Sequence, residues 1–287
     1  MTQNPSFILS SLFSGAIAGI LALAEPVFAL DVRINPGNPQ LGDTISVFVE
    51  VDNPSDRPRV SMGTQNFPAF LLQGNLYRAF IPTTPLERPR TLNIQVSGDG
   101  ETKNLALGLR NRSFSTQRIN VRGGGGGATQ VELDRVAAFK KLVTPEKFWN
   151  GALLRPTSGR VSTVFGVRRY YNGVFAQNYY HRGVDYAAGT GTPVVAPAAG
   201  RIGLIGRESQ GFRVHGNTVG IDHGQGVLSI MLHLHGIDVR EGEMVRAGQR
   251  IGTVGSTGSS TGPHLHWGLY VNGVAIDPVP WRYDGLD

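Results

Sequence analysis

Short segments that alternate apolar and polar side chains constrain the fold of this chain most strongly. Residues 45–51 carry Ile or Val at every second position, which is the period of a half-buried β-strand. The same alternation recurs at residues 92–96 and 105–109, with clusters of Asn, Asp, Pro and Gly between the segments. Glycine supplies 39 of the 287 residues, about twice its usual share. This pattern predicts a mainly β protein with many tight turns.

The region that contains these segments lacks catalytic residue types. Residues 30–121 contain no histidine and no clustered carboxylates. Their short strands and regularly spaced turns predict an immunoglobulin-like β-sandwich. We therefore expect residues 30–121 to serve as a spacer, binding or regulatory module.

Residues 122–147 are expected to connect this module to a second one. Five consecutive glycines at 123–127 predict a flexible joint. A connecting helix should follow, because apolar side chains recur on one helical face before Pro145. The predicted apolar face consists of Val131, Leu133, Val136, Phe139 and Leu142, with Glu132, Asp134, Lys140 and Lys141 pointing outward.

Residues 1–29 resemble a secretory signal peptide. Residues 7–24 are apolar, and small-residue cleavage patterns end at Ala24 and Ala29. No Lys or Arg precedes Arg33, so a single N-terminal membrane anchor is the alternative. An exported protein of the periplasm or cell envelope is the expectation.

Composition narrows the chemistry and the partners. The absence of cysteine excludes a disulfide framework, a zinc ribbon, a cysteine nucleophile and an iron–sulfur cluster. The 27 Lys and Arg exceed the 21 Asp and Glu, which gives a net charge of +6. These basic residues are scattered, so the charge suits an anionic cell-wall polymer better than nucleic acid.

All seven histidines lie between residues 181 and 266. If residues 264–267 form a strand, His264 and His266 point to one face while Leu265 packs inward. His181 precedes Asp185 by four residues, and imidazole and carboxylate are both zinc ligands. Gly183 between them is expected to let the backbone bend so that both side chains reach one ion. The apolar segment 229–235 adds His233 and His235, and the alternation does not decide which of the two faces a metal.

A histidine and aspartate cluster of this kind favours catalytic over structural zinc. Catalytic sites use three protein ligands and keep a position for water, whereas structural sites use four. Two histidines and one aspartate would leave a residual positive charge that acidifies water toward a pKa of about 7. Further histidines could then orient that water or stabilise an oxyanion.

The order and spacing of these motifs resemble the M23 (LytM/lysostaphin-type) zinc metallopeptidases. The resemblance covers about residues 150–280. It extends from the entry segment 162–168, through segment 191–200, to the glycine-rich stretch 248–258 before the last motif. It implies a peptidase domain at 148–287, built as an antiparallel β-sheet with a groove.

Position by position, the resemblance also implies roles for five residues. His181, Asp185 and His266 would bind one zinc ion, His264 would be catalytic, and His233 would be its partner. The implied reaction is endopeptidase cleavage of peptidoglycan peptides. Two positions depart from the family pattern, which usually has Tyr at Met231 and a small polar residue at His235. We expect His215, His223 and His235 to be structural or surface residues.

Two alternatives remain beside this zinc endopeptidase. One is a non-catalytic cell-wall-binding regulator that activates another wall hydrolase. The other is an autoinhibited enzyme, for which a chain starting near Phe148 should cleave faster. The chain has no His-Glu-x-x-His helix and no Gly-x-Ser-x-Gly turn, which disfavours other hydrolase classes. The groove loops, near 169–180 and 206–216, are expected to select between a glycine bridge and a D-alanine cross-link.

Overall fold

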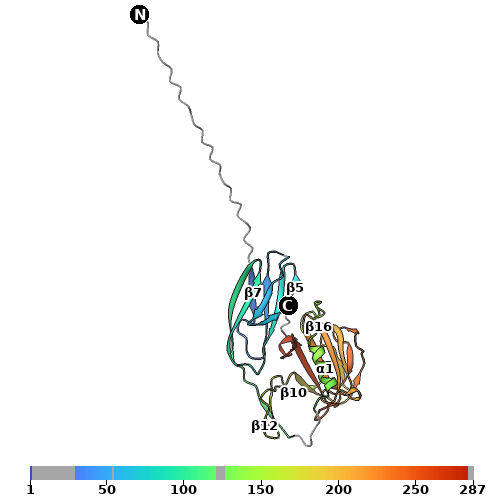
Figure 1. Ribbon diagram of the computed structural model, residues 1–287. Coiled ribbons are helices and arrows are strands. Elements are labelled where there is room, and N and C mark those ends of the chain that lie inside the picture. The colour runs from blue at the N-terminus through green and yellow to red at the C-terminus, as the bar shows by residue number, and fades with distance from the viewer. Residues whose placement is uncertain (2–29, 54, 121–126, 284–287) are drawn as a thin grey trace.

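The computed structural model describes residues 1, 30–53, 55–120 and 127–283, which form a mainly β protein (Figure 1). The predicted signal peptide or anchor lies almost wholly outside the described residues, as does the predicted joint at 123–127 except for Gly127. Within the described ranges, no helix has both the length and the apolar character needed to cross a membrane.

Two antiparallel sheets account for the N-terminal strands and confirm the predicted β-sandwich. The first sheet has the order β1 (Asp31–Asn35), β2 (Thr44–Glu50), β6 (Leu76–Pro82) and β5 (Ala69–Gln73). The second has the order β4 (Gln65–Phe67), β3 (Arg59–Met62), β7 (Arg90–Gly98) and β8 (Glu101–Leu109). Both contribute to one core, in which Val47 of β2 and Leu92 of β7 are fully buried. Burial of each such side chain contributes about 1.5–3 kcal/mol.

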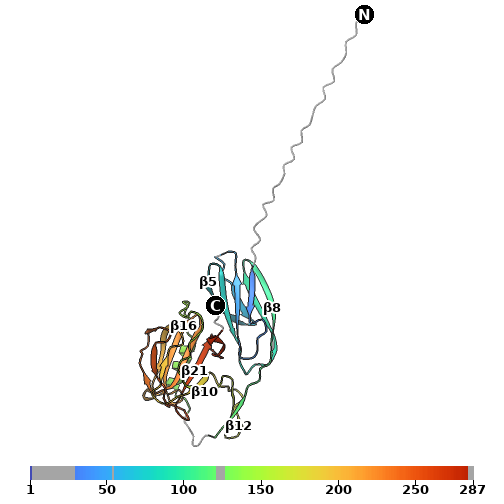
Figure 2. The same ribbon diagram turned by 180° about the vertical axis from the view of Figure 1, so that it is seen from behind.

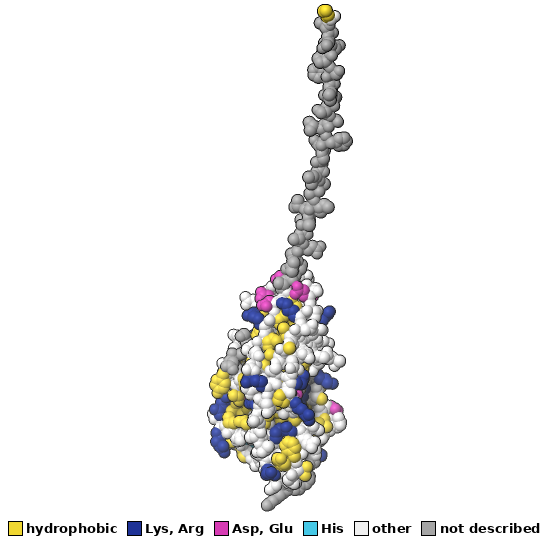
Figure 3. Space-filling view, turned by 90° about the vertical axis from the view of Figure 1, so that its left-hand side faces the viewer, with side chains coloured by type: hydrophobic (Ala, Val, Ile, Leu, Met, Phe, Trp, Pro, Cys, Tyr) yellow, Lys and Arg dark blue, Asp and Glu magenta, His cyan; other side chains and the backbone are white. Residues whose placement is uncertain are grey.

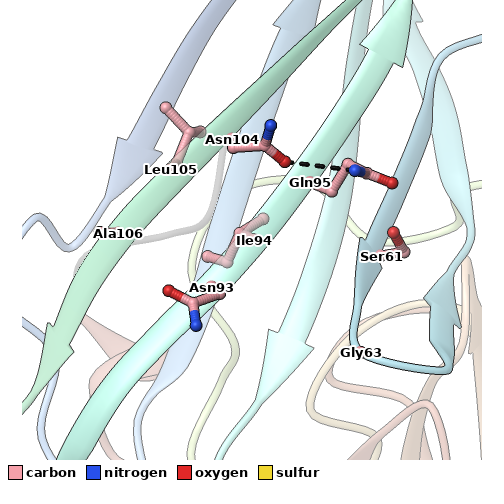
Figure 4. Close-up of a pocket in the computed structure, with 8 residues that line it drawn as sticks. All are labelled: Ser61, Gly63, Asn93, Ile94, Gln95, Asn104, Leu105 and Ala106. Carbon is pink, nitrogen blue, oxygen red and sulfur yellow. Dashed lines mark hydrogen bonds between the residues drawn. The ribbon is translucent and has the colours of Figure 1, made fainter.

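A hollow of about 440 Å³ lies on the second sheet of this sandwich. Gln95 donates a hydrogen bond to Asn104 across it, over 3.2 Å (Figure 4). Its lining residues are Ser61, Gly63, Asn93, Ile94, Gln95, Asn104, Leu105 and Ala106. None of these has an ionisable side chain, so the hollow offers no acid, base or metal ligand.

The C-terminal strands form one large antiparallel sheet and a smaller one. The large sheet has the order β10 (Arg160–Thr163), β13 (Val184–Ala187), β21 (His264–Val271), β17 (Val227–Leu234), β16 (Asn217–Gly224), β15 (Gly200–Gly206) and β19 (Met244–Val245). β22 (Val274–Ile276) also pairs with β21. The small sheet has the order β14 (Pro193–Val195), β20 (Arg250–Thr253) and β18 (Gly236–Ile237), and short 3-10 turns occupy Glu208–Gln210 and Pro280–Arg282.

Helix α1 (Gln130–Lys140) packs on β15 of the large sheet. It begins at Thr129, whose side chain accepts a hydrogen bond from the Glu132 backbone N–H. Gly220 allows the close approach, because a Cβ there would lie 2.7 Å from the Phe139 ring.

The buried face of α1 differs from the predicted one. Glu132, Val136 and Phe139 are buried, whereas Val131 and Leu133 are 55% and 50% exposed. The buried three follow the i, i+4, i+7 spacing of a single helical stripe. Glu132 can occupy that stripe because the backbone N–H groups of residues 213–215 donate hydrogen bonds to its carboxylate. The prediction that Glu132 points outward was therefore wrong.

The sandwich and the large sheet lie side by side and are in direct contact (Figure 2). Phe80 of β6 packs against Trp281 with ring centroids 5.4 Å apart, and its carbonyl accepts a hydrogen bond from Asn272. Arg112 forms an ion pair with Asp277 at 2.8 Å. On the face shown in Figure 3, the basic side chains are dispersed rather than gathered into one patch.

A third, three-stranded sheet joins residues from both sides of the connecting segment. β9 (Thr116–Ile119) pairs in parallel with β11 (Arg168–Tyr171), and β12 (Val174–Phe175) completes it. The sequence patterns did not indicate this pairing. It places β9, which precedes the glycine run at 123–127, beside the predicted groove loop near 169–180.

Candidate metal centre

The pairing of β13 with β21 brings the central pair of site residues together. Asp185 lies directly opposite His266 in the antiparallel register, and directly opposed residues share a face of the sheet. His181 lies just before β13, where its backbone exchanges hydrogen bonds with Val167 and Gly166. All three side chains are buried.

Three donor atoms of these residues converge on one point. His181 Nε2 lies 3.0 Å from Asp185 Oδ1 and 3.1 Å from His266 Nδ1. His266 Nδ1 lies 2.8 Å from the same Asp185 oxygen. Tetrahedral zinc, with ligand atoms 2.0–2.1 Å away, separates those atoms by about 3.3 Å. The cluster therefore has the donor types and nearly the spacing of a zinc site.

The protonation states of this cluster also suit a metal. Burial raises the pKa of Asp185, but hydrogen bonds with His181 and His266 outweigh it and hold that pKa far below its usual range. Burial lowers the pKa of His266 to about 4. His181 Nδ1 donates to the Val164 carbonyl at 2.9 Å, which directs Nε2 toward the cluster, where a metal would take the place of its proton. A metal requires this combination of ionised carboxylate and neutral imidazole.

Gly183 affects how closely the strands of the site can pack, because it has no side chain. The sequence suggested that it lets the backbone bend between His181 and Asp185. In the structure, a Cβ at Gly183 would lie 2.3 Å from the Trp267 carbonyl oxygen and 2.9 Å from the His266 ring. Close packing of β13 on β21, and not a bend, is therefore what requires glycine here.

His264 and His233 border the cluster with one ring nitrogen each fixed by the backbone. His264 Nδ1 donates to the Gly262 carbonyl at 2.8 Å, and its Nε2 lies 4.0 Å from Asp185 Oδ1. His233 Nδ1 donates to the Thr257 carbonyl at 2.8 Å. The two rings are 4.8 Å apart. A carbonyl only accepts hydrogen bonds, so each Nδ1 carries a proton, and in a neutral ring the lone pair is then on Nε2.

The backbone at His233 separates it from His235. His233 has φ of +64°, a left-handed conformation that is uncommon for a residue other than glycine. Strict alternation, which would place both imidazoles on one face, is interrupted there. His233 is buried beside His264 and His266, whereas His235 is exposed. Burial, together with the nearby His266 and His264, lowers the pKa of His233 to about 3.

The remaining two histidines have structural partners. His223 is fully buried between the Ala199 carbonyl and the Ser229 hydroxyl, 2.8 and 2.9 Å away. His215 pairs with Glu132 of α1 at 2.5 Å. Its carbonyl accepts a hydrogen bond from the His233 N–H at 3.0 Å.

Glu132 therefore affects the position of His233 indirectly, through its contacts with His215. Its carboxylate accepts hydrogen bonds from the backbone N–H groups of Arg213, Val214 and His215. Burial raises the pKa of Glu132, but these hydrogen bonds outweigh it and hold that pKa below its usual value. The spacing of Thr129 and Glu132 predicts only a capping role at the start of α1. No sequence pattern indicated that Glu132 fixes the loop preceding His233.

A second hollow, of about 280 Å³, borders this centre. One side comes from β10 and the turn after it, where Thr163 is the register partner of Asp185 and Val164 holds His181. Residues 115–117 form the other side. The predicted groove loops, near 169–180 and 206–216, did not include residues 115–117.

Known proteins resemble the C-terminal part of the chain. Residues 179–278 match the family described as Peptidase family M23. The DD-carboxypeptidase/endopeptidase Mpg of Neisseria meningitidis is 44% identical over 120 residues, covering 42% of this chain and 26% of Mpg. The glycyl-glycine endopeptidase ALE-1 of Staphylococcus capitis is 38% identical over 122 residues, covering 41% of this chain and 32% of ALE-1. The chain thus spans about a third or less of the length of these relatives.

A solved structure extends the likeness across both parts of the chain. A Pseudomonas aeruginosa protein assigned to peptidase M23 superposes with a TM-score of 0.63 at 26% identity. The superposition covers 86% of this chain and 95% of that one. Together with the ordered His–Asp, His and His–x–His motifs, these similarities identify residues 179–278 as a domain of peptidase family M23.

Proposed function

We propose that this protein is an exported zinc endopeptidase that hydrolyses peptide cross-links of peptidoglycan. The observation that carries the proposal is the convergence of His181, Asp185 and His266, with two further histidines at its border. A non-catalytic regulator has no need of unprotonated nitrogens on His264 and His233 beside such a cluster. The relatives Mpg and ALE-1, both named as endopeptidases, support the same reaction class.

His181, Asp185 and His266 would hold the zinc ion. When bound, zinc supplies Lewis acidity, which polarises a scissile carbonyl and acidifies water. Asp185 remains ionised and the His266 imidazole remains neutral, so these two donors need little change in protonation to accept a cation.

His264 would act as the general base and then as the general acid. Its Nε2 has a lone pair and lies on the Asp185 side of the ring. It can take a proton from the attacking water and return it to the leaving amine. The hydrogen bond to Gly262 fixes the orientation of the ring during both transfers.

His233 would orient the attacking water. Because its Nδ1 proton is committed to the Thr257 carbonyl, the ring can only accept a hydrogen bond at Nε2. Of the two roles expected for His233, polarisation of water therefore fits its geometry better than donation to an oxyanion.

The rest of the chain would place this centre at its substrate. We propose that residues 1–29 direct export to the periplasm or cell envelope as a signal peptide or anchor. We retain the division into a sandwich at 30–121, a connector at 122–147 and a peptidase domain at 148–287. The net charge of +6 would favour contact with an anionic cell-wall polymer.

Digestion of purified peptidoglycan tests this function. The zinc-loaded full chain should convert cross-linked muropeptides into monomers, and mass analysis should identify the bond that is cut. A matched sample of the Asp185→Ala variant should leave the cross-links intact. Intact cross-links after treatment with the zinc-loaded wild-type chain would contradict the proposal.

A further inference from the structure

We propose that Arg169 binds a free carboxylate of the peptide substrate and that Gln117 of β9 holds Arg169 in place. This inference rests on the proposed peptidase function and names its substrate class. It favours a cross-linked stem peptide with a free carboxylate near the scissile bond over an uncharged glycine bridge.

Three arginines between residues 168 and 182, the segment that contains His181, have no acidic partner among the described residues. Among the described residues, no carboxylate oxygen lies within 4 Å of a side-chain nitrogen of Arg168, Arg169 or Arg182. Arg168 uses its guanidinium to bind the carbonyls of Tyr179 and Gln177, at 3.0 and 2.7 Å. Arg182 is exposed and lies over the Tyr179 and Tyr180 rings. Arg169 has a different set of partners.

The Arg169 guanidinium is fixed on one side and open on the other. Its Nε donates to Gln117 Oε1 at 3.1 Å, and its Nη1 donates to the Tyr179 hydroxyl at 2.8 Å. Its Nη2 has no acceptor within the part of the chain that the structure describes. A guanidinium has five N–H donors in a planar fork that matches a carboxylate. A preoriented fork with free donors suits the carboxylate of a ligand.

Arg169 is close enough to the metal cluster to serve the same substrate. Burial lowers its pKa, but Tyr179, Tyr171 and the Asp185 carboxylate more than offset this, so its pKa is raised and the group stays charged. Burial raises the pKa of Tyr179 to about 12, so the phenol stays protonated beside the guanidinium. The charged guanidinium therefore interacts electrostatically with Asp185, one of the three metal donors.

Gln117 links this charge to the hollow beside the centre. In the parallel pairing of β9 with β11, Gln117 is the register partner of Arg169. Gln117 also lines the hollow together with Thr163 and Val164, which contact Asp185 and His181. The hollow is thus lined on one side by residues that hold the metal cluster and on the other by the residue that holds Arg169. Strand β9, which precedes the connector, completes the binding site in this arrangement.

Two synthetic peptides test the proposal. One is a cross-linked stem-peptide dimer with a free carboxylate next to the scissile bond, and the other is the same dimer with that carboxylate amidated. Dissociation constants should favour the carboxylate peptide by about tenfold or more. They are measured by calorimetry on the zinc-loaded full chain with the His264→Ala change, which prevents cleavage during the titration. Arg169→Gln should abolish this preference, and Gln117→Ala should reduce it. In turnover assays the loss should appear mainly in KM.

Matched variants separate the proposal from general effects. Arg201→Gln removes the same charge from an exposed position on β15 and should retain the full preference. Arg169→Lys keeps the charge but loses the fork, so it should lose most of the preference and remains available if Arg169→Gln fails to fold. An unchanged preference in both Arg169 variants, or no preference in the wild type, would overturn the proposal. Wild-type binding preference without any cleavage would instead overturn the proposed function alone.

Discussion

The sandwich and the large C-terminal sheet are built from the same kind of alternating strand. Among the described residues, only the C-terminal sheet holds the candidate metal centre. In the sandwich, the inward positions are apolar, and its hollow is lined by residues without ionisable groups. In the C-terminal sheet, Asp185 and His266 occupy buried positions of two paired strands. The comparison shows that a metal centre needs neither a new fold nor a long loop. It needs polar residues at paired positions of neighbouring strands and a glycine that allows those strands to pack closely together.

Substitution of the metal donors should give the largest difference between the two regions in zinc content and peptidase activity. His181→Ala or Asp185→Ala removes one of three donors, so zinc content and peptidase activity should both be lost. Asn93→Ala, in the hollow of the sandwich, should leave both unchanged. Metal analysis of the purified proteins and a muropeptide assay measure the two quantities. Full zinc content in Asp185→Ala would remove that residue from the site.

His264 should show that catalysis and metal binding are separable. His264→Ala removes the proposed general base but none of the three donors. Zinc content should stay near that of the wild type while kcat falls by about 10²–10⁴-fold. Loss of zinc together with activity would make His264 a ligand instead.

Two glycines, one just before β13 and one on β8, give a direct comparison of packing in the two regions. Gly183→Ala places a Cβ 2.3 Å from the Trp267 carbonyl, so stability should fall by about 3 kcal/mol. Gly108→Ala, on β8 of the sandwich, meets nothing within 4 Å and should change stability by less than about 1 kcal/mol. Chemical denaturation of the two variants measures the difference, and equal costs would contradict the packing argument.

Acidification should affect the C-terminal sheet more than the sandwich. Burial lowers the pKa of His223 to about 4 in the folded protein, against about 6.5 when unfolded. The unfolded state therefore binds more protons between these values, and stability is lost as pH falls from about 6.5 to 4. The contribution is on the order of 3 kcal/mol.

Hydrogen exchange, corrected for its intrinsic pH dependence, checks this expectation region by region. Protection should fall on acidification in strands β16 and β17, which hold His223 and its partner Ser229. The sandwich has no histidine and should change less over the same range. A His223→Gln variant whose protection declines as steeply as the wild type's would exclude His223 as the cause.

The sequence predicted the parts of the molecule that depend on local pattern. Alternation located β2, β7 and β8, and the order of the motifs pointed to His181, Asp185 and His266. What it did not predict depends on contacts between distant segments. Glu132 appeared to be a solvent-facing helix residue because its partners, the N–H groups of residues 213–215, lie about eighty positions away. The pairing of β9 with β11 was missed for the same reason, since neither short strand has a distinctive pattern.

Digestion of peptidoglycan by the zinc-loaded full chain, with Asp185→Ala as the control, tests the central claim most directly. The account predicts that the wild type releases monomeric muropeptides and that the variant, folded but without zinc, releases none. Equal release by the two proteins, or none by the zinc-loaded wild type, would contradict it.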